Sequence, residues 1–294
     1  MGLTSNSKMS SKAIVFFALL AVAFAGKSIF RPRLGLRVPY LPSLAFSPQV
    51  VGGDEASQNA HPYIVSLQWG TSSATTSHFC AGSILNSQWI LTAGHCVQAV
   101  PSAGTFLVKA GKHHINIVET TEQTVKVLKS FVHEKYQGGV GPYDVGLLKL
   151  STPLELNSEV QPIELPEAES EPTGDAILIG WGSTSRSGIP NMPDKLQIVD
   201  LHYVDRKTCH EAVERLTGSS PVHETNVCTG PLTGGISACS GDSGGPLVKR
   251  YGNKEKITGI VSWGIIPCGT VGAPSVYTKV SKFNDWLHEK MSNN

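Results

Sequence analysis

Residues Gly241–Pro246 read GDSGGP, and the serine at their centre decides how the rest of the chain is interpreted. A serine hydroxyl is a weak nucleophile at its free pKa, so it needs a neutral base, which histidine supplies near pH 7. His95 lies in Leu91–Cys96 (LTAGHC), and Asp144 opens the apolar segment Asp144–Leu150 (DVGLLKL). A buried carboxylate orients such an imidazole and stabilises its charged form. Each segment alone is compatible with a turn, a structural histidine or a surface aspartate, but together they predict a nucleophile, its base and an orienting acid.

Short apolar or alternating runs recur between turn residues from Val50 onward, which indicates a β-sandwich or barrel. The 30 glycines and 18 prolines are typical of such a turn-rich chain. Two helices are predicted, Asp205–Leu216 with Asp205 as its cap and Ser281–Met291 with Ser281 as its cap. The predicted strands are Tyr63–Gln68, Gly82–Leu85, Trp89–Thr92, Thr105–Ala110, Val125–Lys129, Val145–Leu150, Ala176–Gly180, Leu196–Tyr203, Lys256–Ser262 and Ser275–Lys279.

The three catalytic segments, in this order, resemble those of the chymotrypsin-like serine proteases. The resemblance runs from Val50 to the C-terminus and includes Val50–Gly53 (VVGG), Gly180–Gly182 (GWG), Ser262–Gly264 (SWG) and a terminal helix with Trp286. It implies an all-β fold in which two six-stranded antiparallel Greek-key barrels pack together with a C-terminal helix. The active site is then expected between the two barrel halves.

The same resemblance implies a serine endopeptidase that uses Ser243 as nucleophile, His95 as base and Asp144 as orienting acid. The chain order His, Asp, Ser is that of chymotrypsin rather than that of subtilisin or the α/β-hydrolases. The backbone N–H groups of Gly241 and Ser243 are expected to form the oxyanion hole, because a glycine tolerates the conformation that this loop demands. Protein or peptide substrates, and proteinaceous protease inhibitors, are the partners that this activity implies.

Charge is distributed unevenly along the 294 residues. Residues 1–49 carry six basic residues and no acidic one, which leaves 18 basic and 23 acidic residues from Val50 onward, a net charge of −5. This mildly acidic body has no basic face that would indicate binding to nucleic acid or to a membrane surface. We expect the protein to be a monomer.

The basic first section has the pattern of a secretory signal. Lys8 and Lys12 precede the apolar run Ala13–Phe24, and Ala23–Ala25 supplies a small-x-small cleavage site. Twelve apolar residues are too few to span a bilayer. We therefore predict a signal peptide over residues 1–25 and a secreted, extracellular protein. Residues 26–49, basic and punctuated by proline, are predicted to be an activation pro-segment, although a solvated linker has the same composition, and residues 50–294 the protease domain.

Six cysteines form an even set, and secretion permits disulfides. The residues alone leave 15 connectivities open. The resemblance to the protease family implies Cys80–Cys96, Cys209–Cys228 and Cys239–Cys268, which is the sparser three-bridge pattern of invertebrate members.

Activation is implied by the resemblance as well. In this family a newly liberated N-terminal amine inserts beside the aspartate that precedes the nucleophile, which here gives the ion pair Val50–Asp242. Residue 49 is Gln, where relatives activated by trypsin have Arg or Lys. An activating protease other than trypsin is therefore expected to cut the Gln49–Val50 bond.

The specificity pocket is assigned by counting back from the nucleophile. Ser237 then stands at the pocket floor, where trypsin-like members have Asp, so a lysine or arginine side chain would bury an unpaired charge there. Gly264 leaves one wall open, while Ser275 either narrows the lower pocket or points its hydroxyl into the wall with no effect. Chymotrypsin-like cleavage after Tyr, Phe, Leu or Met is predicted. The alternatives are elastase-like specificity and a non-catalytic homologue that binds a carbohydrate or protein surface.

No cofactor and no metal are expected. The segment Lys112–Glu122 matches the calcium loop of trypsin-like relatives and keeps Glu119 and Glu122, but it starts with a lysine. An ammonium group opposes Ca²⁺ by its charge and is expected to pair with Glu122 instead.

Overall fold

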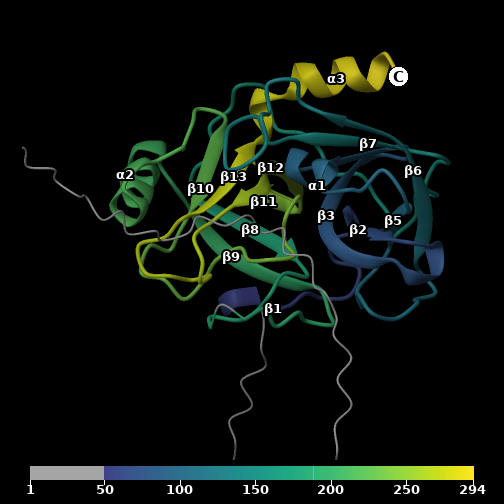
Figure 1. Cartoon of the computed structure of the whole chain (residues 1–294), viewed down its shortest axis with the longest axis horizontal. Coiled ribbons are helices and arrows are strands. Elements are labelled where there is room, and N and C mark those ends of the chain that lie inside the picture. The colour runs from purple at the N-terminus through teal and green to yellow at the C-terminus, as the bar shows by residue number, and fades with distance from the viewer. Residues whose placement is uncertain (1–49, 188) are drawn as a thin grey trace, which may run out of the picture.

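Six antiparallel strands of the N-terminal half close into a barrel in the order β2-β3-β4-β7-β6-β5 (Figure 1). The computed structural model describes residues 50–187 and 189–294, so the predicted signal peptide and pro-segment lie outside the described residues. Every residue of β4 (WILT) is buried, because this strand runs through the centre of the barrel wall toward the active site. The strands are β2 (Ile64–Gly70), β3 (Ser77–Asn86), β4 (Trp89–Thr92), β5 (Thr105–Ala110), β6 (Gln123–Val132) and β7 (Gly146–Leu150).

The C-terminal half forms a second closed barrel, again of six antiparallel strands. Its order is β9-β10-β13-β12-β11-β8, pairing of β8 with β9 closes it, and β1 (Asp54–Glu55) is added at the edge of β9. The expected pair of six-stranded barrels is therefore confirmed. The strands are β8 (Asp175–Gly180), β9 (Gln197–Val204), β10 (Asn226–Thr229), β11 (Pro246–Tyr251), β12 (Lys254–Trp263) and β13 (Ser275–Lys279).

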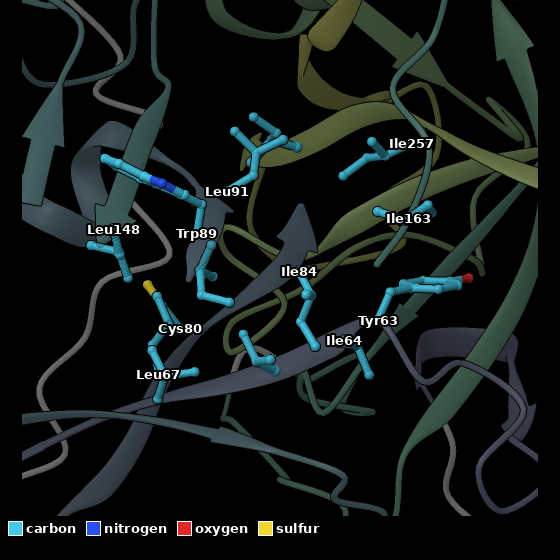
Figure 2. Close-up of a cluster of buried hydrophobic side chains, with 14 of the residues drawn as sticks. Tyr63, Ile64, Leu67, Cys80, Ile84, Trp89, Leu91, Leu148, Ile163 and Ile257 are labelled. Atoms are coloured by element: carbon cyan, nitrogen blue, oxygen red, sulfur yellow. The ribbon is translucent and has the colours of Figure 1, made fainter. Parts of the chain in front are cut away.

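Both barrels contribute to one hydrophobic core. The cluster drawn in Figure 2 joins side chains of the first barrel, such as Ile84 and Trp89, to Ile257 of β12 and Ile163 of the connection between the barrels. Leu287 of the C-terminal helix belongs to the same cluster. Apolar burial stabilises a fold by about 25 cal/mol per Å², so this shared core fixes the two barrels against each other.

Three helices are present in the described residues: α1 (Gly94–Gln98), α2 (Arg206–Thr217) and α3 (Asn284–Ser292). Asp205 caps α2 as predicted, since its Oδ1 accepts a hydrogen bond from Thr208 N at 3.0 Å. Short 3₁₀ turns lie at Val50–Gly52, Ser73–Thr75 and Val280–Lys282. Among residues 50–187 and 189–294, no helix is long and apolar enough to cross a bilayer.

The sequence prediction was wrong on several elements. It missed α1 and the strands β1, β10 and β11. It also began the last helix at Ser281, whereas α3 begins at Asn284 and the Ser281 hydroxyl donates to the carbonyl oxygen of Ser170 instead of capping. A glycine-led five-residue helix shows no apolar period, and β11 opens with a proline, which is tolerated only at a strand's first residue, an edge or a bulge.

Three disulfides join the pairs that the resemblance implies: Cys80–Cys96, Cys209–Cys228 and Cys239–Cys268. The first links β3 to α1, the second links α2 to β10, and the third links the two loops before β11 and β13. Such bridges each contribute about 2–4 kcal/mol, chiefly by restricting the unfolded chain.

Candidate active site

His95 lies on the short helix α1, directly after β4, and is held there by Asp144. The backbone N–H of His95 donates to Asp144 Oδ1, and its Nδ1 lies 2.8 Å from Asp144 Oδ2. An ionised carboxylate only accepts hydrogen bonds, so the proton of this pair lies on Nδ1 and leaves Nε2 as the acceptor. The two side chains are 4% and 2% exposed, so the pair is largely shielded from water.

Asp144 is itself fixed from the second barrel. Its Oδ2 accepts a hydrogen bond of 2.5 Å from Ser262 Oγ at the end of β12, and its backbone oxygen accepts one of 2.7 Å from Thr278 Oγ1 in β13. Sequence reasoning gave neither residue a role, although Ser262 stood in the quoted SWG segment. The acid therefore belongs to a network that spans both barrels.

Ser243 lies in the turn before β11, against the strand that leads to His95. The Ala81 N–H donates to Ser243 O at 2.8 Å, and a Cβ on Gly244 would lie 2.2 Å from Thr92 Oγ1. The Ser243 hydroxyl is buried and makes no hydrogen bond within the described parts of the chain. Bonds between nucleophile and base are often long in a free enzyme and shorten when substrate binds.

Two backbone donors at Ser243 and in the loop before it are left without a backbone acceptor among the described residues. Gly241 has φ of 99°, a conformation that only glycine adopts without strain. Within residues 50–187 and 189–294, neither the Gly241 N–H nor the Ser243 N–H has a backbone acceptor. These are the groups expected to bind an oxyanion.

His78 supports this loop and was not predicted as a site residue. Its Nε2 lies 3.1 Å from the Gly241 carbonyl oxygen and its Nδ1 lies 2.9 Å from Ser66 Oγ. Burial lowers the pKa of His78 to about 4, so the ring is neutral at pH 7 and donates from Nε2 to the carbonyl. A lone histidine at the start of a strand belongs to no sequence motif. The role of His78 is visible only in its hydrogen bond to Gly241, which lies 163 positions away in the sequence.

Asp242 is fully buried beside the N-terminal segment. Its carboxylate accepts hydrogen bonds from Gly182 N at 2.8 Å and Cys239 N at 3.0 Å. Burial raises the pKa of Asp242 to about 7, against the lowering effect of these two bonds. Val51, one residue beyond the expected new terminus, is buried against the Cys239–Cys268 disulfide. The segment that would carry the amine therefore packs next to the loop of its expected acidic partner.

Comparison with known proteins identifies the family. The family model described as Trypsin matches residues 50–287. The chain belongs to the trypsin family. It is 36% identical over 255 residues to "Lectizyme" of Glossina austeni, covering 83% of this chain and 87% of that one. It is 34% identical to "Serine protease 1" of Rattus norvegicus (94% and 99% covered) and 38% identical to "Trypsin-1" of Astacus astacus (81% and 98%).

Membership of the trypsin family makes the protein a serine endopeptidase, and its substrates are proteins and peptides. Two candidate pocket residues, Ser237 and Ser275, are buried. Ser275 Oγ accepts a hydrogen bond of 3.1 Å from the Ala238 N–H, which favours the interpretation that its hydroxyl points into the pocket wall. Ser237 Oγ is buried and has no hydrogen-bond partner in the described residues. Gly264 directly follows β12 and is buried as well.

In this trypsin-family chain, the loop Lys112–Glu122 begins with a buried lysine. Lys112 Nζ lies 2.6 Å from Glu122 Oε2, 2.8 Å from Ile117 O and 3.8 Å from Glu119 Oε2. Burial acts to raise the pKa of Glu122, but hydrogen bonds from Lys109 and Lys112 outweigh it and hold that pKa below its ordinary value. The ammonium thus occupies the place between two carboxylates and a carbonyl where a cation would bind.

Replacing Lys112 by methionine is expected to lower the free energy of unfolding by about 3 kcal/mol, because the largely buried Glu119 loses its charge partner and Glu122 keeps only Lys109. The Lys112 side chain is 1% exposed. Lys195→Met is the matched control: its ion pair with Glu55 is more than two-fifths exposed, and we expect it to contribute less than about 1 kcal/mol. Urea unfolding with and without EDTA measures both. A chelator-sensitive wild-type protein would show that a metal, and not Lys112, holds the loop.

One further group in the described part of the chain has metal-ligand residue types. Cys80, Cys96 and His95 bring their ligand atoms within 4.8 Å of one another. Because the two sulfur atoms are bonded to each other, neither is a thiolate, and the group offers a metal only one donor.

Proposed function

We propose that the protein is a secreted serine endopeptidase that forms an acyl-enzyme on Ser243. The Ser243 oxygen attacks the substrate carbonyl carbon while its proton passes to His95 Nε2, and Asp144 stabilises the resulting imidazolium. The backbone N–H groups of Gly241 and Ser243 bind the oxyanion. His95 then donates the proton to the leaving amine, and a water molecule, deprotonated by the same histidine, releases the acyl group. The double contact of His95 with Asp144 is the observation that carries this assignment.

A fluorophosphonate label tests the assignment directly. We expect covalent labelling of the mature protein, mapped to the peptide that contains Ser243, and loss of labelling in the Ser243→Ala variant. A non-catalytic binding homologue remains the alternative, and it predicts no labelling although the protein folds. The retained His95, Asp144 and Ser243, together with the glycine of the oxyanion loop, favour the enzyme.

For the substrate, we propose chymotrypsin-like cleavage after Tyr, Phe, Leu or Met. A neutral serine at position 237 offers no charge to a lysine or arginine, whereas an apolar side chain gains about 1.5–3 kcal/mol from burial. Ser275 does not oppose this preference, since its hydroxyl is bonded to Ala238 N. Elastase-like preference for smaller side chains is the second candidate.

A peptide-library profile should therefore show dominant cleavage after Tyr, Phe, Leu and Met and very little after Lys or Arg. Because the Ser275 hydroxyl is bonded to the pocket wall, Ser275→Gly should change the ratio of kcat/KM for Phe and Leu substrates by less than about threefold. The same replacement removes the acceptor for Ala238 N and should lower the free energy of unfolding by about 1 kcal/mol. Dominant cleavage after Arg would contradict the role of Ser237 at the floor, and cleavage mainly after Ala or Val would support the elastase-like alternative.

We further propose that the protein is made as a zymogen and secreted. Three disulfides suit an oxidising extracellular compartment. Both properties fit membership of the trypsin family, whose model begins to match this chain at Val50. The glutamine at position 49 indicates an activating protease that does not require a basic residue.

A further inference from the structure

Tyr143, the residue before Asp144, has a backbone conformation that is unfavourable for its type. Its φ is 64°, and in the described residues only Asn59 and Glu169 share a positive φ without being glycine. Asparagine tolerates this left-handed region, whereas a bulky aromatic residue is strained there. Such strain persists only where neighbouring groups hold the residue in place, and it concentrates at functional sites.

The Tyr143 ring is held by rings from three other segments. It stacks on His133 with centroids 5.2 Å apart and planes at 23°, and it lies 5.6 Å from His223 and 6.1 Å from Phe283. His133 in turn lies 5.2 Å from the Trp286 ring of α3. The stack therefore connects the C-terminal helix to the residue that precedes the catalytic acid.

His133 contacts the main chain on the other side of Asp144 as well. Its backbone N–H donates to Val145 O at 3.1 Å, and the Val145 N–H donates to Tyr143 O at 2.8 Å, which closes a tight turn around Asp144. Burial lowers the pKa of His133, and its Nδ1 accepts a hydrogen bond from Lys135 N, so the ring is neutral and has a fixed orientation. Both flanks of Asp144 thus contact His133, one through its ring and the other through its backbone N–H.

The carboxylate at the centre of this turn has little freedom. Asp144 makes three contacts of 2.5–2.8 Å, to His95 N, His95 Nδ1 and Ser262 Oγ. A small rotation of the turn would lengthen all three at once, and misplacement of a catalytic group by about 1 Å costs up to about a hundredfold in rate.

We propose that His133 and Tyr143 are a positioning pair: the stacked rings hold Tyr143 in its left-handed conformation and thereby fix the orientation of Asp144 toward His95. Both residues act through Asp144, and neither belongs to the proposed catalytic set. The inference rests on the proposed catalytic role of Asp144. It goes further, because it assigns a function to two residues outside the catalytic set and explains why a tyrosine stands at a position where its backbone is strained.

The test is a double-mutant cycle on the mature enzyme, normalised by active-site titration. His133→Ala removes the support and leaves the strain, so kcat should fall about tenfold with KM within about twofold of wild type. In the Tyr143→Gly background there is no strained residue to support, so the same histidine replacement should lower kcat by less than about twofold. His133→Phe keeps a stacking ring and should recover most of the lost kcat, which separates the stack from folding effects. His202→Ala, at an exposed site, is the control.

The pH profile gives a readout that a merely structural role would not move. A loosened Asp144–His95 contact stabilises the imidazolium less, so in His133→Ala the apparent acidic pKa of kcat should fall by about half a unit. An unchanged kcat and profile in His133→Ala, or equal losses in both backgrounds, would overturn the positioning pair. If Asp144→Asn itself retained full activity, the proposed catalytic assignment would fail instead.

Discussion

Ser243→Ala is expected to lower kcat by about 10⁶-fold while leaving folding and peptide binding almost unchanged. The hydroxyl has no hydrogen-bond partner among the described residues, so its removal breaks no native bond. The missing oxygen is the atom that forms the acyl-enzyme. Single-turnover and steady-state assays with a chromogenic peptide measure the loss of kcat, and thermal unfolding measures whether the fold is retained.

His95→Ala should be comparably severe, and the double variant should lose little more than either single variant, because the base has no function without the nucleophile. The exposed Ser102→Ala serves as the control for replacement of a serine. Clearly additive losses in the double variant would contradict a shared catalytic unit.

Cleavage of the Gln49–Val50 bond is expected to convert an inert precursor into the active enzyme, and Asp242→Asn should keep the cut protein inactive. The physical reason is the buried carboxylate, which has no cationic partner among the described residues until the Val50 amine is liberated. N-terminal sequencing of the active form should begin at Val50. Full activity of a protein that begins at Gly26 would refute the switch, and efficient activation by trypsin would refute the expected type of activating protease.

The same carboxylate predicts how precursor stability depends on pH. Its folded pKa of about 7 lies above the ordinary value of 3.8, so its contribution to stability is fully present below pH 3.8 and is lost as pH rises toward 7. In a Ser243→Ala precursor, which cannot digest itself, the free energy of unfolding should therefore fall between pH 4 and 7. Asp242→Asn should flatten this slope, whereas Asp175→Asn, at an exposed site, should not.

The chemistry of the site could be predicted from sequence because it restricts residue types severely. A neutral base, a buried acid and a nucleophile in one chain order left few other interpretations for His95, Asp144 and Ser243. The first and last residues of a strand were predicted correctly where the apolar run is short and has turn residues on both sides, as at Trp89–Thr92 and Thr105–Ala110.

What the sequence could not reveal is contact between distant segments. His78 reaches the Gly241 carbonyl oxygen, and Ser262 reaches Asp144, across more than a hundred positions. The hydroxyl orientation of Ser275 was left open between two alternatives because it depends on the backbone N–H of Ala238. Local sequence patterns do not identify such partners, because these residues come into contact only when both barrels have formed.

The core that the two barrels share determines how the protein responds to cleavage of its backbone. Ile257 of β12 and Ile84 of β3 belong to one buried cluster, so each half loses apolar contacts if the other is removed. A single nick in an exposed loop should therefore leave two fragments that stay associated, and heat should melt them in one cooperative transition rather than barrel by barrel.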